Sequence, residues 1–118
     1  MSKVYHYIIP DIPPSNNRFI GRNNRWNYQE LKKQWAQLIA IYCRPKPKFP
    51  FPRSVVTLEY HFGDNRRRDP DNYSGKFILD GLKSSGIIED DCFKCIDLQL
   101  KAVCDGEKET HIFVESRC

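Results

Sequence analysis

The chain has 118 residues, of which 40% are hydrophobic and 13% aromatic, enough for one compact domain spanning 1–118 rather than a disordered chain. No apolar run approaches the roughly 20 residues that a membrane helix needs, and the first residues lack the pattern of a signal peptide. We therefore expect a cytoplasmic protein with no membrane partner. The five cysteines are an odd number, which argues against a disulfide framework.

The net charge of +4 is unevenly distributed along the chain. Residues 1–53 hold ten of the 19 lysines and arginines but only two of the 15 acids, so the acids concentrate in 54–118. This asymmetry favours a basic surface for a polyanion beside a local carboxylate cluster. Two solvated surfaces without any partner would give the same pattern, so charge alone leaves a nucleic-acid partner open.

The first elements in chain order are a strand and a loop. β-Branched and aromatic residues predict a strand over 4–9. The prolines and asparagines of 13–17 predict a turn. Residues 18–26, where arginines alternate with aromatic residues, are expected to form an ordered loop.

A helix and a second strand follow. Apolar residues at helical spacing predict a helix over 29–42 whose buried stripe is Leu31, Trp35, Leu38 and Tyr42. Four prolines make 44–53 an extended connector. The apolar residues of 54–62 predict the second strand.

The last third of the chain predicts a second helix and two strands. Asp69 or Asp71 is expected to cap a helix that ends at Gly86, with Ile78, Leu79 and Leu82 on its apolar face. Strands over 96–103 and 110–115 are expected to form a hairpin around an Asp-Gly turn. The order β-α-β-α-β-β predicts an α+β fold, a small mixed sheet with two helices packed on one face.

Carboxylates bracket the predicted second helix. Asp69 and Asp71 precede it with one residue between them, and Asp91 follows it in an acidic run. Mg²⁺ takes oxygen ligands and keeps several waters beside a few carboxylates, so this pattern fits a catalytic metal site. Helix capping by the first pair and a solvated loop for the acidic run explain the same residues without a metal. Arg66, Arg67 and Arg68 shift the balance, because they would bind phosphates next to the metal.

The stretch from Arg66 to Asp91 resembles the signature of RusA-type Holliday-junction resolvases: basic residues, Asp-x-Asp-Asn, a lysine, an Asp-x-Leu helix, a glycine turn and Asp-Asp. Residues 13–18 are similar to the opening turn of that family. The resemblance implies a homodimeric endodeoxyribonuclease that uses Mg²⁺, with Mn²⁺ as a substitute, and resolves four-way DNA junctions by paired symmetric cuts. It implies metal binding by Asp69, Asp71 and Asp91 and an essential role for Lys76.

One departure from the family spacing surrounds the lysine. Lys76 lies five residues after Asp71, one more than the family pattern, so an extra residue is inferred within 73–75. Gly75 would permit a bulge or a looser first turn there. An exposed helix lysine without a catalytic role is the alternative for Lys76.

The resemblance and the basic first half also indicate which residues bind branched DNA. Cations next to aromatic residues are typical of DNA-binding surfaces, although the same loop could simply pack on the sheet. The predicted DNA-binding residues are Asn16, Asn17, Arg18, Arg22, Arg25, Arg66, Arg67 and Arg68.

Three other functions remain open: a non-cleaving branched-DNA-binding protein, a nuclease for flap or other branched DNA, and a nucleotide phosphohydrolase. Cys92 and Cys95 form a lone CxxC without the second pair that a structural zinc site needs, so we expect free, partly buried thiols. His61 is expected at the surface of a strand end, and His6 and His111 show no recognisable ligand spacing.

Overall fold

The computed structural model describes residues 4–15, 25–70 and 73–117. The elements in these ranges are β1 (Val4–Ile9), α1 (Arg25–Tyr42), β2 (Ser54–Phe62), α2 (Lys76–Ser84), β3 (Ile96–Cys104) and β4 (Glu109–Ser116). The predicted α+β class and the order β-α-β-α-β-β are confirmed. Within these ranges, neither helix is long and apolar enough to cross a membrane.

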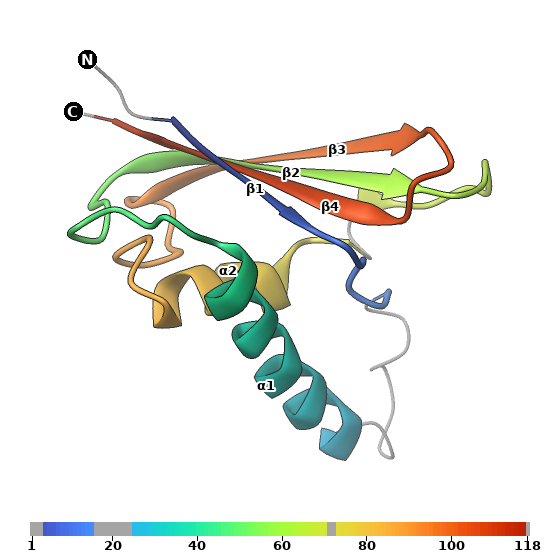
Figure 1. Ribbon diagram of the computed structural model, residues 1–118, viewed down its shortest axis with the longest axis horizontal. Helices are drawn as coiled ribbons and strands as arrows, with labels where there is room; N and C mark the ends of the chain where they lie inside the picture. The colour runs from blue at the N-terminus through green and yellow to red at the C-terminus, as the bar shows by residue number, and fades with distance from the viewer. Residues whose placement is uncertain (1–3, 16–24, 71–72, 118) are drawn as a thin grey trace.

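The four strands form one mixed sheet in the order β1-β4-β2-β3 (Figure 1). β4 runs antiparallel to both β1 and β2, whereas β3 runs parallel to β2. The predicted hairpin between the last two strands is wrong, because the loop after β3 crosses the end of β2, where Gly106 N donates to Phe62 O at 3.3 Å. Alternate residues of β4 are fully buried, as a central strand requires, while most of β3 is exposed and suits the edge.

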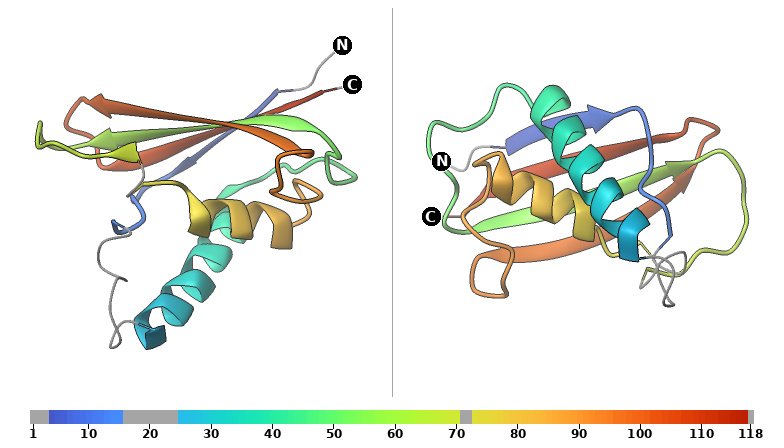
Figure 2. Two further views of the ribbon diagram at one scale, coloured as in Figure 1. Left: turned by 180° about the vertical axis from the view of Figure 1, so that it is seen from behind. Right: turned by 90° about the horizontal axis from the view of Figure 1, so that it is seen from below.

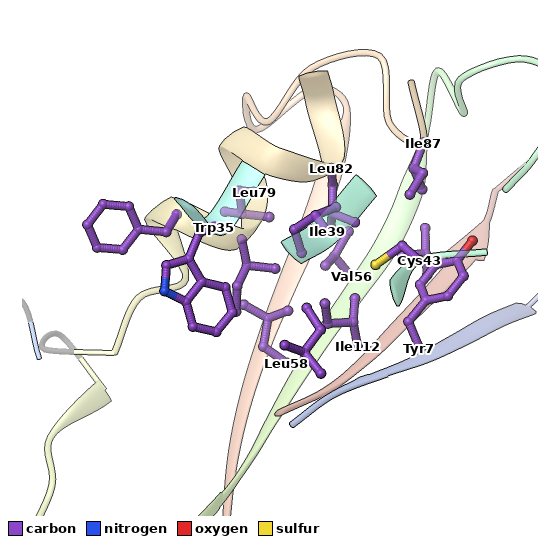
Figure 3. Packing of buried hydrophobic residues seen from close by; sticks show 14 of the residues in the cluster. Tyr7, Trp35, Ile39, Cys43, Val56, Leu58, Leu79, Leu82, Ile87 and Ile112 are labelled. Carbon is purple, nitrogen blue, oxygen red and sulfur yellow. The ribbon is translucent and has the colours of Figure 1, made fainter. Parts of the chain in front are cut away.

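Both helices cover the same face of the sheet, as predicted, and no described element covers the other face (Figures 1 and 2). The core lies between the two layers (Figure 3). Ile39 of α1 and Leu82 of α2 meet Val56, Leu58 and Ile112 of the sheet, and all five are fully buried. This apolar layer fixes the position of α2 and therefore of the residues at its two ends.

Helix α1 begins at Arg25, four residues before the predicted start, so the expected loop over 18–26 is wrong at its C-terminal end. The buried stripe also differs, because Tyr42 is 42% exposed whereas Ile39 and Cys43 are almost fully buried. An α-helix has 3.6 residues per turn, so residues four apart lie on nearly the same face. The buried face of α1 therefore runs from Trp35 through Ile39 to Cys43.

Helix α2 begins at Lys76, so the predicted capping by Asp69 or Asp71 is wrong. Its N-cap is Gly75, in the left-handed conformation at φ 83°, and no side chain caps the helix. The left-handed residue breaks the helical run, which cannot extend back towards Pro70. The predicted apolar face of α2 is confirmed, since Ile78, Leu79 and Leu82 are all buried.

Candidate functional site

The basic loop after β2 is organised around Asp64. Its carboxylate accepts hydrogen bonds from Arg66 N at 3.0 Å and from Arg66 Nε at 3.3 Å, and it pairs with Arg68 Nη2 at 2.9 Å. The backbone hydrogen bond from Arg66, followed by the contact with Arg68, lowers the pKa of Asp64 from 3.8 to about 2. Asp64 therefore keeps its charge, and its contacts with Arg66 and Arg68, well below neutral pH.

The three arginines of this loop have different surroundings. The guanidinium of Arg68 lies 4.0 Å from the centre of the Phe62 ring and donates to two loop carbonyls, so its side chain is only 15% exposed. The side chains of Arg66 and Arg67 are 80% and 90% exposed. Arg68 therefore holds the loop against the sheet, while Arg66 and Arg67 present their charges to solvent.

The basic loop and residues 13–15, the described part of the predicted N-terminal turn, line one cleft of about 670 Å³. Pro13, Pro14 and Ser15 lie along it together with Arg66 and Arg68. Two sequence motifs that are about fifty residues apart therefore face the same space. The predicted DNA-binding residues Asn16, Asn17, Arg18 and Arg22 lie outside the described residues, and Arg25 is in the first turn of α1, where only the backbone is described.

Asp69 is half-buried at the end of the basic loop. It lines a hollow of about 70 Å³ beside Tyr60 of β2 and Leu100 of β3, and its Oδ1 lies 3.3 Å from Arg67 Nε. The carboxylate is thus directly next to an exposed arginine. Asp71 lies outside the described residues.

Tyr28 is the main influence on the charge of Lys76. A hydrogen bond with Tyr28 is the largest cause that raises the pKa of Lys76, and the charges of Asp80 and Asp91 raise it further. The ammonium nitrogen also lies 5.2 Å from the centre of the Tyr28 ring. Lys76 is therefore a cation at the first turn of α2 in contact with Tyr28, and Asp91 is exposed after the end of that helix.

Lys76 lies at the start of α2 and the exposed Asp91 lies after its end, and the three-aspartate site as a whole is untested because Asp71 is not described. Among the described residues, one group of His, Cys, Asp and Glu side chains has three ligand atoms within 4.8 Å, and it consists of Glu59, His61 and His111.

Sequence reasoning missed this cluster, and its expectation for His61 is wrong, since the residue is only 8% exposed. A signal was present. Glu59-Tyr60-His61 and Glu109-Thr110-His111 are both Glu-x-His, and in a strand this spacing puts both polar side chains on one face.

The cysteines in the described ranges are unbonded thiols, as expected. The Sγ atoms of Cys92 and Cys95 lie 3.5 Å apart. Cys92 is exposed, whereas the sequence predicted partly buried thiols.

Comparison with known proteins returned no matching family model and no matching curated protein. A function for this chain therefore has to be argued from its own residues and their geometry.

Proposed function

We propose that this protein is a Mg²⁺-dependent endodeoxyribonuclease that resolves four-way DNA junctions by paired symmetric cuts. The observation that carries the proposal is the cleft shared by the N-terminal turn and the basic loop, since the chain's two resolvase-like motifs meet there. The basic loop leads directly into Asp69, so a phosphate bound by the loop would lie next to a carboxylate that can hold a metal ion.

Electrostatics of the loop support phosphate binding. Arg66 and Arg67 are largely exposed, and Asp64 neutralises only part of the loop's positive charge. Exposed arginines bind phosphate oxygens in a bidentate way and release counterions, which gives affinity without sequence preference. A structure-selective enzyme needs this kind of contact because it recognises the shape of a junction rather than its bases.

The donor set also fits the proposed metal ion. Asp69, Asp71 and Asp91 would hold Mg²⁺, and the accessibility of Asp69 and Asp91 leaves room for the waters that a hydrated Mg²⁺ ion retains. When bound, the ion would polarise a phosphoryl oxygen and lower the pKa of an attacking water.

Lys76 has a role of its own in this proposal. Its ammonium group is protonated at neutral pH, and its contact with Tyr28 raises its pKa further. In this proposal the ammonium group would stabilise the negative charge that develops on the phosphate or on the leaving oxygen. Tyr28 is then a positioning residue for Lys76.

Two cuts on opposing strands require two active sites, and one chain carries a single proposed set of acids. A two-fold homodimer, the commonest closed assembly, matches the two-fold symmetry of a junction. Phe49 and Phe93 are 73% and 102% exposed and Phe51 is half-buried, which makes these three residues candidates for the dimer contact.

Replacing Asp91 by asparagine tests the proposal. Asp91→Asn removes one charged ligand while leaving the shape nearly unchanged, so folding and junction binding should persist while cutting falls by at least about 100-fold. Asp97→Asn, a change of the same chemistry at an exposed position of β3, is the control and should cut normally. Cutting by Asp91→Asn at the rate of the control would refute the metal assignment.

A further inference from the structure

All three histidines of the chain gather on the face of the sheet that the helices do not cover. His6 comes from β1, His61 from β2 and His111 from β4. Their neighbours Tyr60 and Ile112 are buried in the core, so the alternation of a strand directs His61 and His111 to the opposite face. The ring centres of these two histidines lie 4.2 Å apart, and those of His6 and His111 lie 5.0 Å apart.

The sheet register makes the cluster reciprocal. In the antiparallel pair of β2 and β4, Glu59 lies opposite His111 and His61 lies opposite Glu109. Each glutamate also contacts the histidine of its own strand, with Glu59 Oε1 2.7 Å from His61 Nε2 and Glu109 Oε1 2.8 Å from His111 Nε2. The two Glu-x-His segments therefore lie side by side in antiparallel strands, on the face of the sheet that the helices do not cover.

Both ring nitrogens of His61 face carboxylates, because Nδ1 lies 2.7 Å from Asp105 Oδ2. Ionised carboxylates only accept hydrogen bonds, so without a metal ion each nitrogen of this ring carries a proton, and a metal ion bound to Nε2 would replace one of these protons. A histidine that donates one ring nitrogen to a carboxylate and offers the other to a metal is the usual arrangement of a metal-binding histidine.

The other two histidines share one proton between two ring nitrogens, so a metal ion could replace that proton. His6 Nε2 and His111 Nδ1 lie 2.9 Å apart, and only one proton fits between two ring nitrogens. One of these nitrogens therefore presents a lone pair to the other. The hydrogen bond between His111 Nε2 and Glu109 fixes the orientation of the His111 ring. The hydrogen bond between His61 Nδ1 and Asp105 does the same for the His61 ring.

From these contacts we infer that Glu59, His61 and His111 form a binding site for a zinc-class transition-metal ion, with His6 or water completing the coordination. The ligand atoms of the first three residues already lie within 4.8 Å of one another. Two imidazoles and one carboxylate form a set that Zn²⁺ and its neighbours prefer, whereas Mg²⁺ prefers oxygen ligands. Three carboxylates around the histidines, those of Glu59, Asp105 and Glu109, supply the negative charge that a divalent cation needs.

The site is separate from the acids of the proposed nuclease, and it has a structural consequence. A metal ion there would link β2 to β4 across the sheet, close to the end of β2. His61 lies three residues before Asp64, so the ion would also stiffen the start of the basic loop. The side chain of His61 is 10% exposed and that of His111 is 15% exposed, so solvent and ions can reach the cluster although most of its surface is covered.

Zinc binding by the full-length chain tests the inference without reference to DNA cutting. Protein carrying serine in place of Cys92, Cys95, Cys104 and Cys118, which leaves only the buried thiol of Cys43, is stripped with a chelator and titrated with Zn²⁺ against a chromophoric competitor. Millimolar Mg²⁺ occupies the oxygen-ligand sites. We expect one Zn²⁺ per chain, a higher melting temperature with the metal, and a Co²⁺ spectrum without thiolate charge transfer.

Matched variants identify the ligands. Glu59→Gln and His111→Gln should each weaken Zn²⁺ binding by at least about tenfold, and Asp105→Asn by roughly 10–100-fold because the orientation of His61 is lost. Glu107→Gln makes the same chemical change on an exposed turn residue and should bind Zn²⁺ normally. If His111→Gln does not fold, the isosteric and partly exposed Glu59→Gln decides. Binding below one ion per chain, or equal affinity in Glu59→Gln and Glu107→Gln, would overturn the inference.

Discussion

Replacing Gly75 by alanine should destabilise the protein more than any comparable glycine change at a turn. Gly75 has φ 83°, a left-handed conformation that costs a residue with a Cβ about 1–2 kcal/mol. An added Cβ would also lie well inside van der Waals contact with Cδ1 of Leu58, a fully buried residue that has little room to move. Overpacking of this kind costs about 1–3 kcal/mol, so the two effects together amount to about 2–5 kcal/mol.

Gly86 offers a matched control at the other end of α2. It has φ 78°, but an added Cβ there would meet nothing within 4 Å, so Gly86→Ala should show the backbone cost alone. Thermal and urea unfolding followed by circular dichroism would measure both variants. For a domain of this size, Gly75→Ala should lower the melting temperature by roughly 8–20 °C. If Gly75→Ala were as stable as Gly86→Ala, the close packing of Gly75 against Leu58 would not contribute to stability.

Three further predictions concern the loop and the assembly. Replacing Arg66 and Arg67 with alanine should reduce the slope of log junction affinity against log salt by about 0.9 per lost phosphate contact. The control Arg117→Ala should leave this slope unchanged. A slope in the double variant equal to that of the wild type would show that neither loop arginine contacts phosphate. Because the pKa of Asp64 is lowered from 3.8 to about 2, its stabilising effect is present above pH 4 and is lost as the pH falls through about 2. Asp64→Asn should therefore flatten the pH dependence of urea unfolding between pH 4 and 2. Mixed dimers of wild-type and Asp71→Asn subunits should nick a junction in supercoiled plasmid once and rarely resolve it, and efficient paired cutting would contradict the dimer proposal.

The local elements were predictable because their signals are local. The β-branched and aromatic residues of β1 and β2 placed both strands with the observed bounds, and the apolar spacing of α2 identified its buried face. Sheet pairing was not predictable in the same way. The Asp105–Gly106 turn favours a hairpin, yet β4 pairs with β1 and β2 rather than with β3, and such pairing depends on the whole sheet.

The start of α2 shows a second limit. An aspartate before an apolar helix is a good capping signal, but the left-handed Gly75 packs against Leu58, and a contact between distant residues overrides the local preference. The basic loop shows a third limit. Arg66, Arg67 and Arg68 are equivalent in the sequence, and the contacts of Arg68 with the Phe62 ring and with loop carbonyls distinguish it from the two arginines that face solvent.

The histidine cluster was hidden for a related reason. Ligand spacing is readable in a sequence when the ligands lie on one helix or one loop, whereas His6 and His111 are 105 residues apart and meet only through the pairing of β1 with β4. The repeated Glu-x-His pattern is the one local signal of that face.

Cleavage by the purified wild-type protein tests the central proposal most directly. A labelled four-way junction and a linear duplex of the same sequence are incubated with the protein in Mg²⁺ or in EDTA, and the products are mapped on each strand. The proposed function predicts symmetric cuts in opposing strands of the junction, in Mg²⁺ and not in EDTA, with the linear duplex left intact. An uncut junction in Mg²⁺, or a linear duplex that is cut as fast as the junction, would contradict it.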